Sequence, residues 1–178
     1  MDLEFVQGLF QFLTREEESC LIEISDSIDT YQAIGNQSML SLYLTLLAEG
    51  YCRLGKIDQT AQLLQQAEDF IEETGERFYQ AEVLRVKGML MEATSTSEEA
   101  EACYMDALQL ARKQKAKTLE LRAATSLARL WKGQQRSDEA YQVLAKVYNW
   151  FTEGFDTADL KEALTLLERL GGTFDKDE

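Results

Sequence analysis

The chain has 178 residues, 45% hydrophobic and 28% charged, a balance that predicts a folded protein and excludes a disordered one. Its formal charge of −14 disfavours binding to nucleic acids and to anionic membrane surfaces, so we expect neither as a partner. The sequence lacks proline, which favours helix throughout, and lacks histidine, which excludes Cys/His zinc sites and histidine-dependent catalysis.

The cysteines and the start of the chain bear on location. Cys20, Cys52 and Cys103 are widely spaced, which is typical of reduced thiols in the cytosol. Residues 1–4 lack the basic start of a signal peptide, and no apolar run has the length of a membrane span. We therefore expect a cytoplasmic protein.

Apolar residues recur with helical spacing along the chain, and glycines mark several expected helix ends. We predict helices at residues 2–14, 16–34, 37–54, 57–74, 77–93, 97–115, 117–133, 137–152 and 157–170. Residues 96–99, Thr-Ser-Glu-Glu, have the form of a capping box. In the last helix Leu160, Leu164 and Leu167 are expected to face inward, as in a helix that caps the end of a solenoid.

A repeat of forty residues organises these helices into pairs. Two columns of small residues recur at this period, namely Gly8, Ala48, Gly88 and Ala128, and then Cys20, Thr60, Ala100 and Ala140. Small residues let two helices approach closely, while large apolar residues at helical spacing fill the surrounding space. The pattern matches the tetratricopeptide (TPR) consensus, except that its period is longer than about 34 residues and its proline is missing.

The repeat predicts an all-α fold, an α-α superhelix of the TPR-like right-handed solenoid type. We expect a single domain over residues 1–178, with helix pairs at about 2–35, 37–75, 77–115 and 117–153 and a capping helix at about 157–170.

Two kinds of segment contain the residue types of a ligand site without its spacing. Residues 50–57 match GxxxxGK, but Ile57 stands where a phosphate loop needs Ser or Thr to hold magnesium. The acidic runs at 16–18, 72–73 and 98–101 lack EF-hand spacing and are typical of solvated helix surfaces. We predict no catalytic residue, no metal site and no cofactor.

Four aromatic residues stand just before the last predicted helix: Tyr148, Trp150, Phe151 and Phe155. They could form a stacking platform for nucleotides, but we favour packing beneath the terminal helix.

Positive charge is concentrated in one segment. Eight of the 18 Lys and Arg residues fall within 112–136, where Glu120 is the one acid. Arg122, Arg129 and Lys132 share a face of the helix predicted at 117–133, and the first helices of TPR pairs line the concave groove. This face is our candidate docking site for an acidic segment. The alternatives are a solvated face and an intramolecular partner for the acidic surface.

Four segments resemble, in amino-acid sequence, the C-terminal TPR region of large bacterial signalling proteins. They are residues 74–91, 100–104, 119–131 and 148–160. Those proteins join a class III adenylate/guanylate cyclase or a DNA-binding domain to an AAA/STAND-type ATPase and then to repeats. The resemblance covers about residues 35–170.

This resemblance implies a sensor or scaffold segment whose family catalytic site lies outside the chain. We expect a non-catalytic protein–protein interaction module of a bacterial signalling or regulatory system. Its partner would be a protein or peptide in the concave groove, or neighbouring domains of a larger protein, and self-association is possible. The alternative is a free-standing peptide-binding adaptor or co-chaperone.

Overall fold

The computed structural model describes residues 18–33 and 39–171, and these residues form helices without any strand. The helices are α2 (Glu18–Ala33), α3 (Leu40–Arg53), α4 (Ile57–Thr74), α5 (Gln80–Thr94), α6 (Ser97–Gln114), α7 (Lys117–Gly133), α8 (Ser137–Tyr148) and α9 (Ala158–Arg169). The prediction of an all-α chain is confirmed for this part of the sequence. The helix predicted at 2–14, with Gly8, lies outside it, as does the side chain of Cys20.

The helix ends follow from local chemistry. At the start of α6 the Thr96 side chain accepts a hydrogen bond from the Glu99 amide, and the Glu99 side chain accepts one from the Thr96 amide. This confirms the capping box, which satisfies two amides that the first turn leaves free. Helix α4 ends at Gly75, whose φ of 73° is left-handed and whose amide donates to the Ile71 carbonyl.

Helix α8 is shorter than predicted, ending at Tyr148 rather than at residue 152. The amides of Trp150 and Phe151 bond to carbonyls three residues back, to Val147 and Tyr148, which turns the chain out of the helix. The apolar residues at 150 and 151 continue the helical pattern in sequence but belong to this turn.

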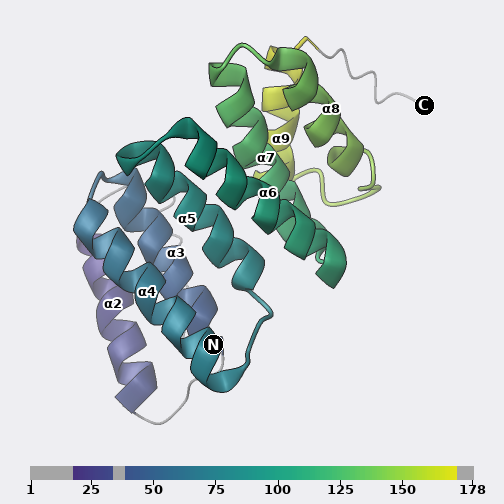
Figure 1. The fold of residues 1–178 in the computed structure, drawn as a ribbon. Helices are drawn as coiled ribbons and strands as arrows, with labels where there is room; N and C mark the ends of the chain where they lie inside the picture. Colours follow the sequence, from purple (N-terminus) through teal and green to yellow (C-terminus); the bar gives the residue numbers. More distant parts are fainter. Residues whose placement is uncertain (1–17, 34–38, 172–178) are drawn as a thin grey trace.

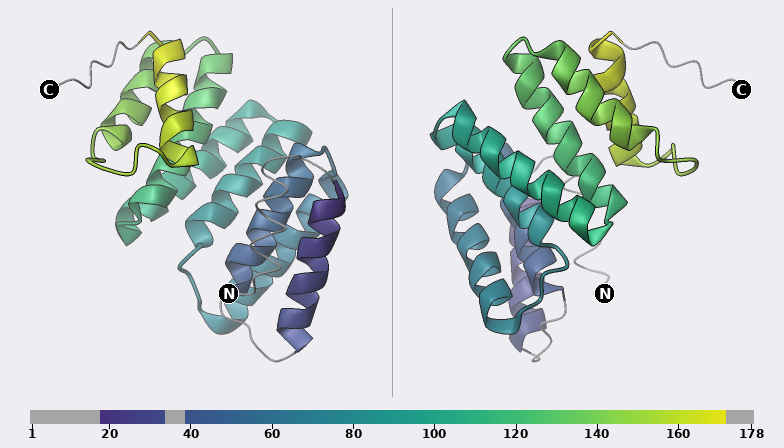
Figure 2. Two further views of the ribbon diagram at one scale, coloured as in Figure 1. Left: turned by 180° about the vertical axis from the view of Figure 1, so that it is seen from behind. Right: turned by 45° about the vertical axis from the view of Figure 1, so that its right-hand side comes forward.

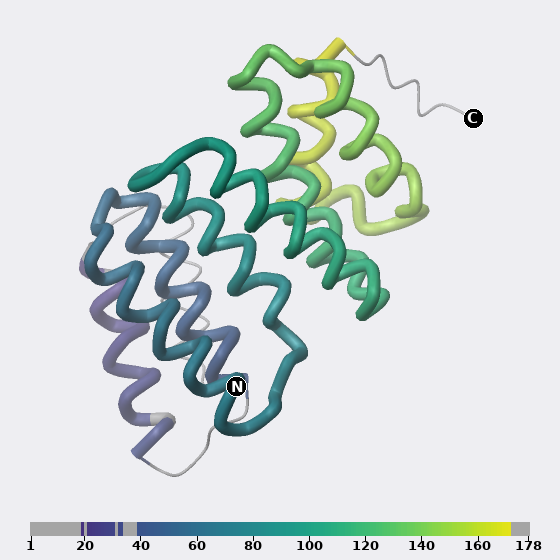
Figure 3. Tube along the Cα trace, viewed as in Figure 1, coloured from purple at the N-terminus to yellow at the C-terminus, as the bar shows by residue number. Residues whose placement is uncertain are grey.

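Consecutive helices pack together as pairs, α3 with α4, α5 with α6 and α7 with α8 (Figure 1). The first helices of the pairs also contact one another, α3 with α5 and α5 with α7. Helix α2 packs against α3. The order of the helices in space therefore follows their order in the chain, as the trace in Figure 3 makes plain.

Helix α9 takes the place of a further first helix. It packs against α7 and α8, just as α7 packs against α5 and α6, and the view from behind shows it lying over both (Figure 2). Its sequence repeats that of α7 at the forty-residue period: Ala123, Thr125, Leu127 and Arg129 are matched by Ala163, Thr165, Leu167 and Arg169. The last of the described helices is thus equivalent to the first half of another pair.

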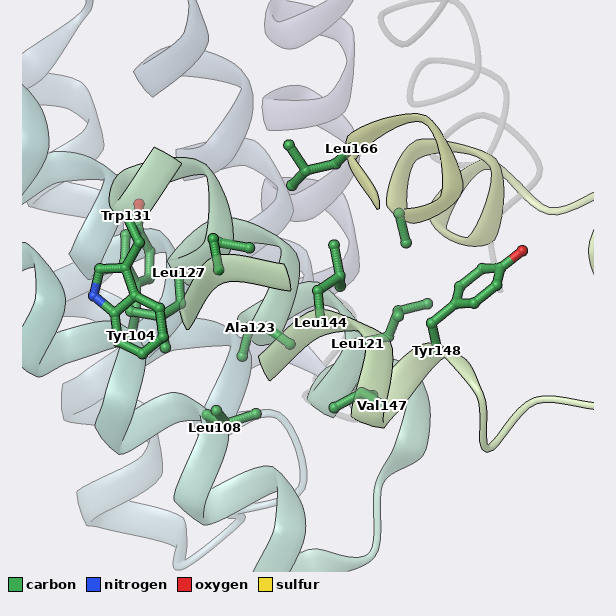
Figure 4. Packing of buried hydrophobic residues seen from close by; sticks show 14 of the residues in the cluster. Tyr104, Leu108, Leu121, Ala123, Leu127, Trp131, Leu144, Val147, Tyr148 and Leu166 are labelled. Atoms are coloured by element: carbon green, nitrogen blue, oxygen red, sulfur yellow. The ribbon is translucent and has the colours of Figure 1, made fainter. Parts of the chain in front are cut away.

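The apolar side chains form two cores on either side of α5. One joins α2, α3 and α4 to Val83, Val86 and Leu90 of α5. The other joins α6, α7, α8 and α9, whose side chains meet around Leu127 and Leu144 (Figure 4). Helix α5 therefore packs against both cores.

The residues before and within α9 follow expectation in part. Tyr148 is buried and its ring centroid lies 6.1 Å from that of Phe155. Trp150, however, is 58% exposed and contacts Phe151 edge-on, so its predicted packing beneath the last helix is wrong. Of the leucines expected to face inward, Leu160 and Leu167 are buried and Leu164 is half-buried.

The small-residue columns lie where paired helices approach most closely. Ala48 and Ala128 are fully buried, and the Thr60 hydroxyl lies 3.5 Å from the Ala48 carbonyl oxygen across the pair. At Gly88 an added Cβ would lie 2.5 Å from a ring carbon of Tyr104. Side-chain size at this position therefore sets the distance between α5 and α6.

We expect Gly88→Ala to destabilise the protein by about 1–3 kcal/mol, and Gly88→Leu or Ala128→Leu by more, because the added atoms force paired helices apart. Gly133→Ala is the matched control, since nothing lies within 4 Å of its added Cβ. It should leave stability unchanged or raise it slightly. The measurement is the free energy of urea unfolding, and equal values for the Gly88 and Gly133 variants would refute the assigned contact.

Candidate functional site

A groove opens along the first helices of the stack. Its main cleft, of about 680 Å³, is lined from α3 by Cys52 and Arg53, from α5 by Met89 and Ala93, and from α7 by Arg129. A smaller cleft of about 40 Å³ shares part of this lining and extends it towards α9. We call these two adjoining clefts the groove.

The floor of the groove is a network of buried charges. Arg85 of α5, whose side chain is 4% exposed, donates from Nη2 to Glu49 of α3 at 2.6 Å and to Glu82 at 2.7 Å. Arg122 of α7 donates to the same two carboxylates, at 2.9 Å to Glu49 and 2.7 Å to Glu82. Each buried carboxylate therefore lies between two guanidinium groups. Glu49, Glu82, Arg85 and Arg122 are called the buried ion network below.

The network holds its members in their charged forms. Burial acts to raise the pKa of Glu49, but Arg85, Arg122 and Arg53 together lower this pKa from 4.5 to about 2. Burial acts to lower the pKa of Arg85, and the two carboxylates raise it well above its ordinary value instead. Two positive and two negative charges thus neutralise one another across three helices.

Other groups that face the main cleft remain protonated. Burial raises the pKa of the Cys52 thiol, and the carboxylates of Glu49 and Glu92 raise it further. The Tyr104 hydroxyl donates a hydrogen bond to Glu92, and burial with this bond raises the pKa of Tyr104 well above its usual range. A neutral thiol and a neutral phenol are weak nucleophiles, so neither is activated for chemistry in this setting.

The rim of the groove carries charges that face solvent. Arg53, 39% exposed, donates to Glu49 at 2.7 Å. Arg129, 48% exposed, forms an ion pair with Glu162 of α9. Burial, followed by repulsion from Arg85 and Arg53, lowers the pKa of Arg129, while Tyr104 and Glu49 act to raise it.

A further cleft of about 380 Å³ lies between α7 and α9. It is lined by Arg129, Lys132, Glu162, Thr165, Leu166 and Arg169. Because Arg129 and Glu162 line both this cleft and the groove, the two adjoin. We call this space the α7–α9 cleft.

The three residues of the predicted docking face have different surroundings in the structure. Arg129 and Lys132 line open clefts, as expected of residues on a binding surface. Arg122 is 22% exposed, belongs to the buried ion network and lies 3.9 Å from Asp159 of α9. For Arg122 the structure therefore shows the intramolecular pairing that was an alternative to docking, because its two terminal guanidinium nitrogens bind buried carboxylates.

Sequence reasoning missed the partners of Arg122. Glu49, Glu82, Arg53 and Arg85 were not among the candidate residues. The repeat contains a signal that could have found one of them, Glu82. In the column of residues 42, 82, 122 and 162 the last three are Glu, Arg and Glu, so that opposite charges alternate from α5 to α7 to α9.

Comparison with known proteins adds no assignment, since no protein-family model matches the chain and no curated protein is significantly similar to it. Within residues 18–33 and 39–171, no helix combines the length and apolarity of a membrane span. The same residues contain no group of three or more Cys, Asp or Glu side chains placed to hold a metal ion.

The buried ion network predicts a loss of stability in acid. Because the pKa of Glu49 is lower in the folded protein than its ordinary 4.5, its contribution is fully present above pH 4.5 and is lost as the pH falls towards about 2. The shift corresponds to about 3 kcal/mol. Urea unfolding at about pH 6 and about pH 3 should show a smaller acid-induced loss in Glu49→Gln than in the parent protein.

Glu49→Gln should also destabilise the protein at neutral pH, because it leaves Arg85 and Arg122 with one buried carboxylate between them. The control is Glu153→Gln in the exposed loop before α9, which should keep the pH dependence of the parent. An identical acid-induced loss in parent and Glu49→Gln would contradict the role of Glu49.

Proposed function

We propose that this chain is a non-catalytic protein-binding module with a TPR-like, right-handed superhelical arrangement, whose groove receives a segment of a partner protein. The observation that carries the proposal is the side-by-side packing of the first helices, α3, α5, α7 and α9, along which the groove opens. The forty-residue repeat supports it, because stacked helix pairs present one extended surface made of equivalent positions.

The chemistry of the groove supports binding rather than catalysis. Its buried charges neutralise one another, and the thiol and phenol that face it are held in their neutral forms. A rigid floor with polar groups at the rim is the arrangement that orients a bound segment. The proposal includes a cytoplasmic location, for which the widely spaced cysteines are the support.

The setting of the module is also a proposal. Resemblance to the repeat regions of cyclase- and ATPase-containing proteins favours a role in bacterial signalling, with the partner segment in the same protein or in another. The second candidate is a free-standing adaptor. Its support is that the groove and the α7–α9 cleft adjoin, with volumes of about 680 Å³ and about 380 Å³, which leaves room for a segment of several residues.

A blocked groove tests the binding function. Ala93 is exposed and lines the main cleft, so Ala93→Trp should fill the cleft without disturbing either core. The control Ala102→Trp places the same side chain on an exposed position of α6 outside the cleft. Peptides selected from a displayed random library against the parent protein should bind Ala93→Trp about tenfold or more weakly and Ala102→Trp with unchanged affinity.

Fluorescence anisotropy of the labelled peptides measures these affinities, and circular dichroism checks that both variants keep the helical fold. Selected peptides that bind both variants as tightly as the parent would contradict the groove as the binding surface. Failure to recover any peptide that depends on the groove would contradict the proposed function itself.

A further inference from the structure

We propose that the occupant of the groove is an extended acidic segment, whose carboxylates bind Arg53 and Arg129 and continue to Lys132 and Arg169, displacing Glu162 from Arg129. This inference rests on the proposed function and names the chemistry of the partner.

Not all the cations of the groove are available to a ligand. Arg85 and Arg122 already share the carboxylates of Glu49 and Glu82, with N···O distances of 2.6 to 2.9 Å. A ligand could use them only by leaving a carboxylate buried and unpaired, which is strongly unfavourable. These two arginines therefore belong to the floor and not to the binding surface.

The cations that remain lie at the rim and on the path into the α7–α9 cleft. Arg53 and Arg129 are 39% and 48% exposed. Lys132 and Arg169 line the α7–α9 cleft and form no ion pair with any residue of the described ranges. In a chain whose net charge is −14, these four cations from α3, α7 and α9 complement an acidic partner, because they outnumber the carboxylates that line the same clefts outside the buried ion network, Glu92, Asp159 and Glu162.

Arg129 lies where the two clefts meet. Burial, with repulsion from Arg85 and Arg53 after it, lowers its pKa, so an added carboxylate at this guanidinium would stabilise its charged form. Glu162 supplies one carboxylate there, and its side chain is 50% exposed. An exposed ion pair of this kind contributes little to stability, so a ligand can exchange for Glu162 at small cost. Glu162 thus marks the position that a ligand carboxylate would take.

The distance between the cations limits how far apart the carboxylates of a partner segment can lie. Arg129 and Arg169 are equivalent positions of α7 and α9, forty residues apart, so they project from the same face of consecutive first helices. Packed helices have axes about 8–10 Å apart. This distance equals about three residues of extended chain at ~3.3 Å each. We therefore expect the acidic residues of the partner segment to recur two or three positions apart.

The peptides recovered from the random library provide the probe. Those whose binding is lost in Ala93→Trp should be rich in Asp and Glu at this spacing. Arg53→Gln with Arg129→Gln should weaken their binding about tenfold or more, and raising NaCl from about 50 to about 300 mM should weaken the parent complex. The matched control is Lys113→Gln with Lys146→Gln, which removes the same charge from exposed positions outside these clefts and should change nothing.

Glu162→Gln is the most discriminating variant, because we expect it to raise the affinity for acidic peptides. Removing the intramolecular competitor should tighten acidic peptides several-fold, whereas damage to the fold would weaken them. Arg122 is left unchanged in every variant, since replacing it would disturb the buried ion network.

The outcomes separate this inference from the proposed function. Groove-dependent peptides that are neutral or basic would overturn the acidic partner while leaving the binding function intact. Acidic peptides that ignore the Arg53 and Arg129 substitutions, or that bind Glu162→Gln no better than the parent, would overturn the assigned contacts. The absence of any groove-dependent peptide would overturn both proposals.

Discussion

Four charged side chains at the centre of the stack, Glu49, Glu82, Arg85 and Arg122, join helices that are otherwise separate in the chain. Each carboxylate lies between two guanidinium groups, so burial leaves no charge of this set unpaired. Removing four charges from water is costly, and the attraction between them largely offsets that cost without adding much stability. The network favours one register between neighbouring first helices, because sliding one helix along the other would leave a buried charge without its partner.

The two apolar cores depend on this register. Helix α5 contributes to both, with Val86 in one and Leu84 packed against the other, while its polar face is turned towards Glu49 and Arg122. Gly88 then meets Tyr104 on α6, at a distance that leaves no room for a methyl group. Charge pairing on one side of α5 and close packing on the other therefore specify a single orientation of this helix.

The groove inherits its chemistry from the same arrangement. Its floor is electrically neutral, so the charged groups at its rim, cations and carboxylates alike, would decide what it attracts. Helix α9, as the first half of another repeat, brings Asp159 and Glu162 close to Arg122 and Arg129. The last helix thus both covers the second core and places these two carboxylates beside the groove.

Much of this architecture is determined by the sequence. The spacing of apolar residues gives α4 and α7 their bounds, and the forty-residue columns give the sites of close approach, because helix periodicity and side-chain size are local properties. The end of α8 was missed because Trp150 and Phe151 continue an apolar pattern that their backbone leaves. The TPR-like superhelix and the link to signalling proteins stay predictions. The role of Arg122 was decided only by tertiary structure, since Arg122 and Glu49 are 73 residues apart and meet only when α3, α5 and α7 stack. A charge pattern shows that a face is polar, but whether that face meets water or an opposite charge depends on which helix lies beside it.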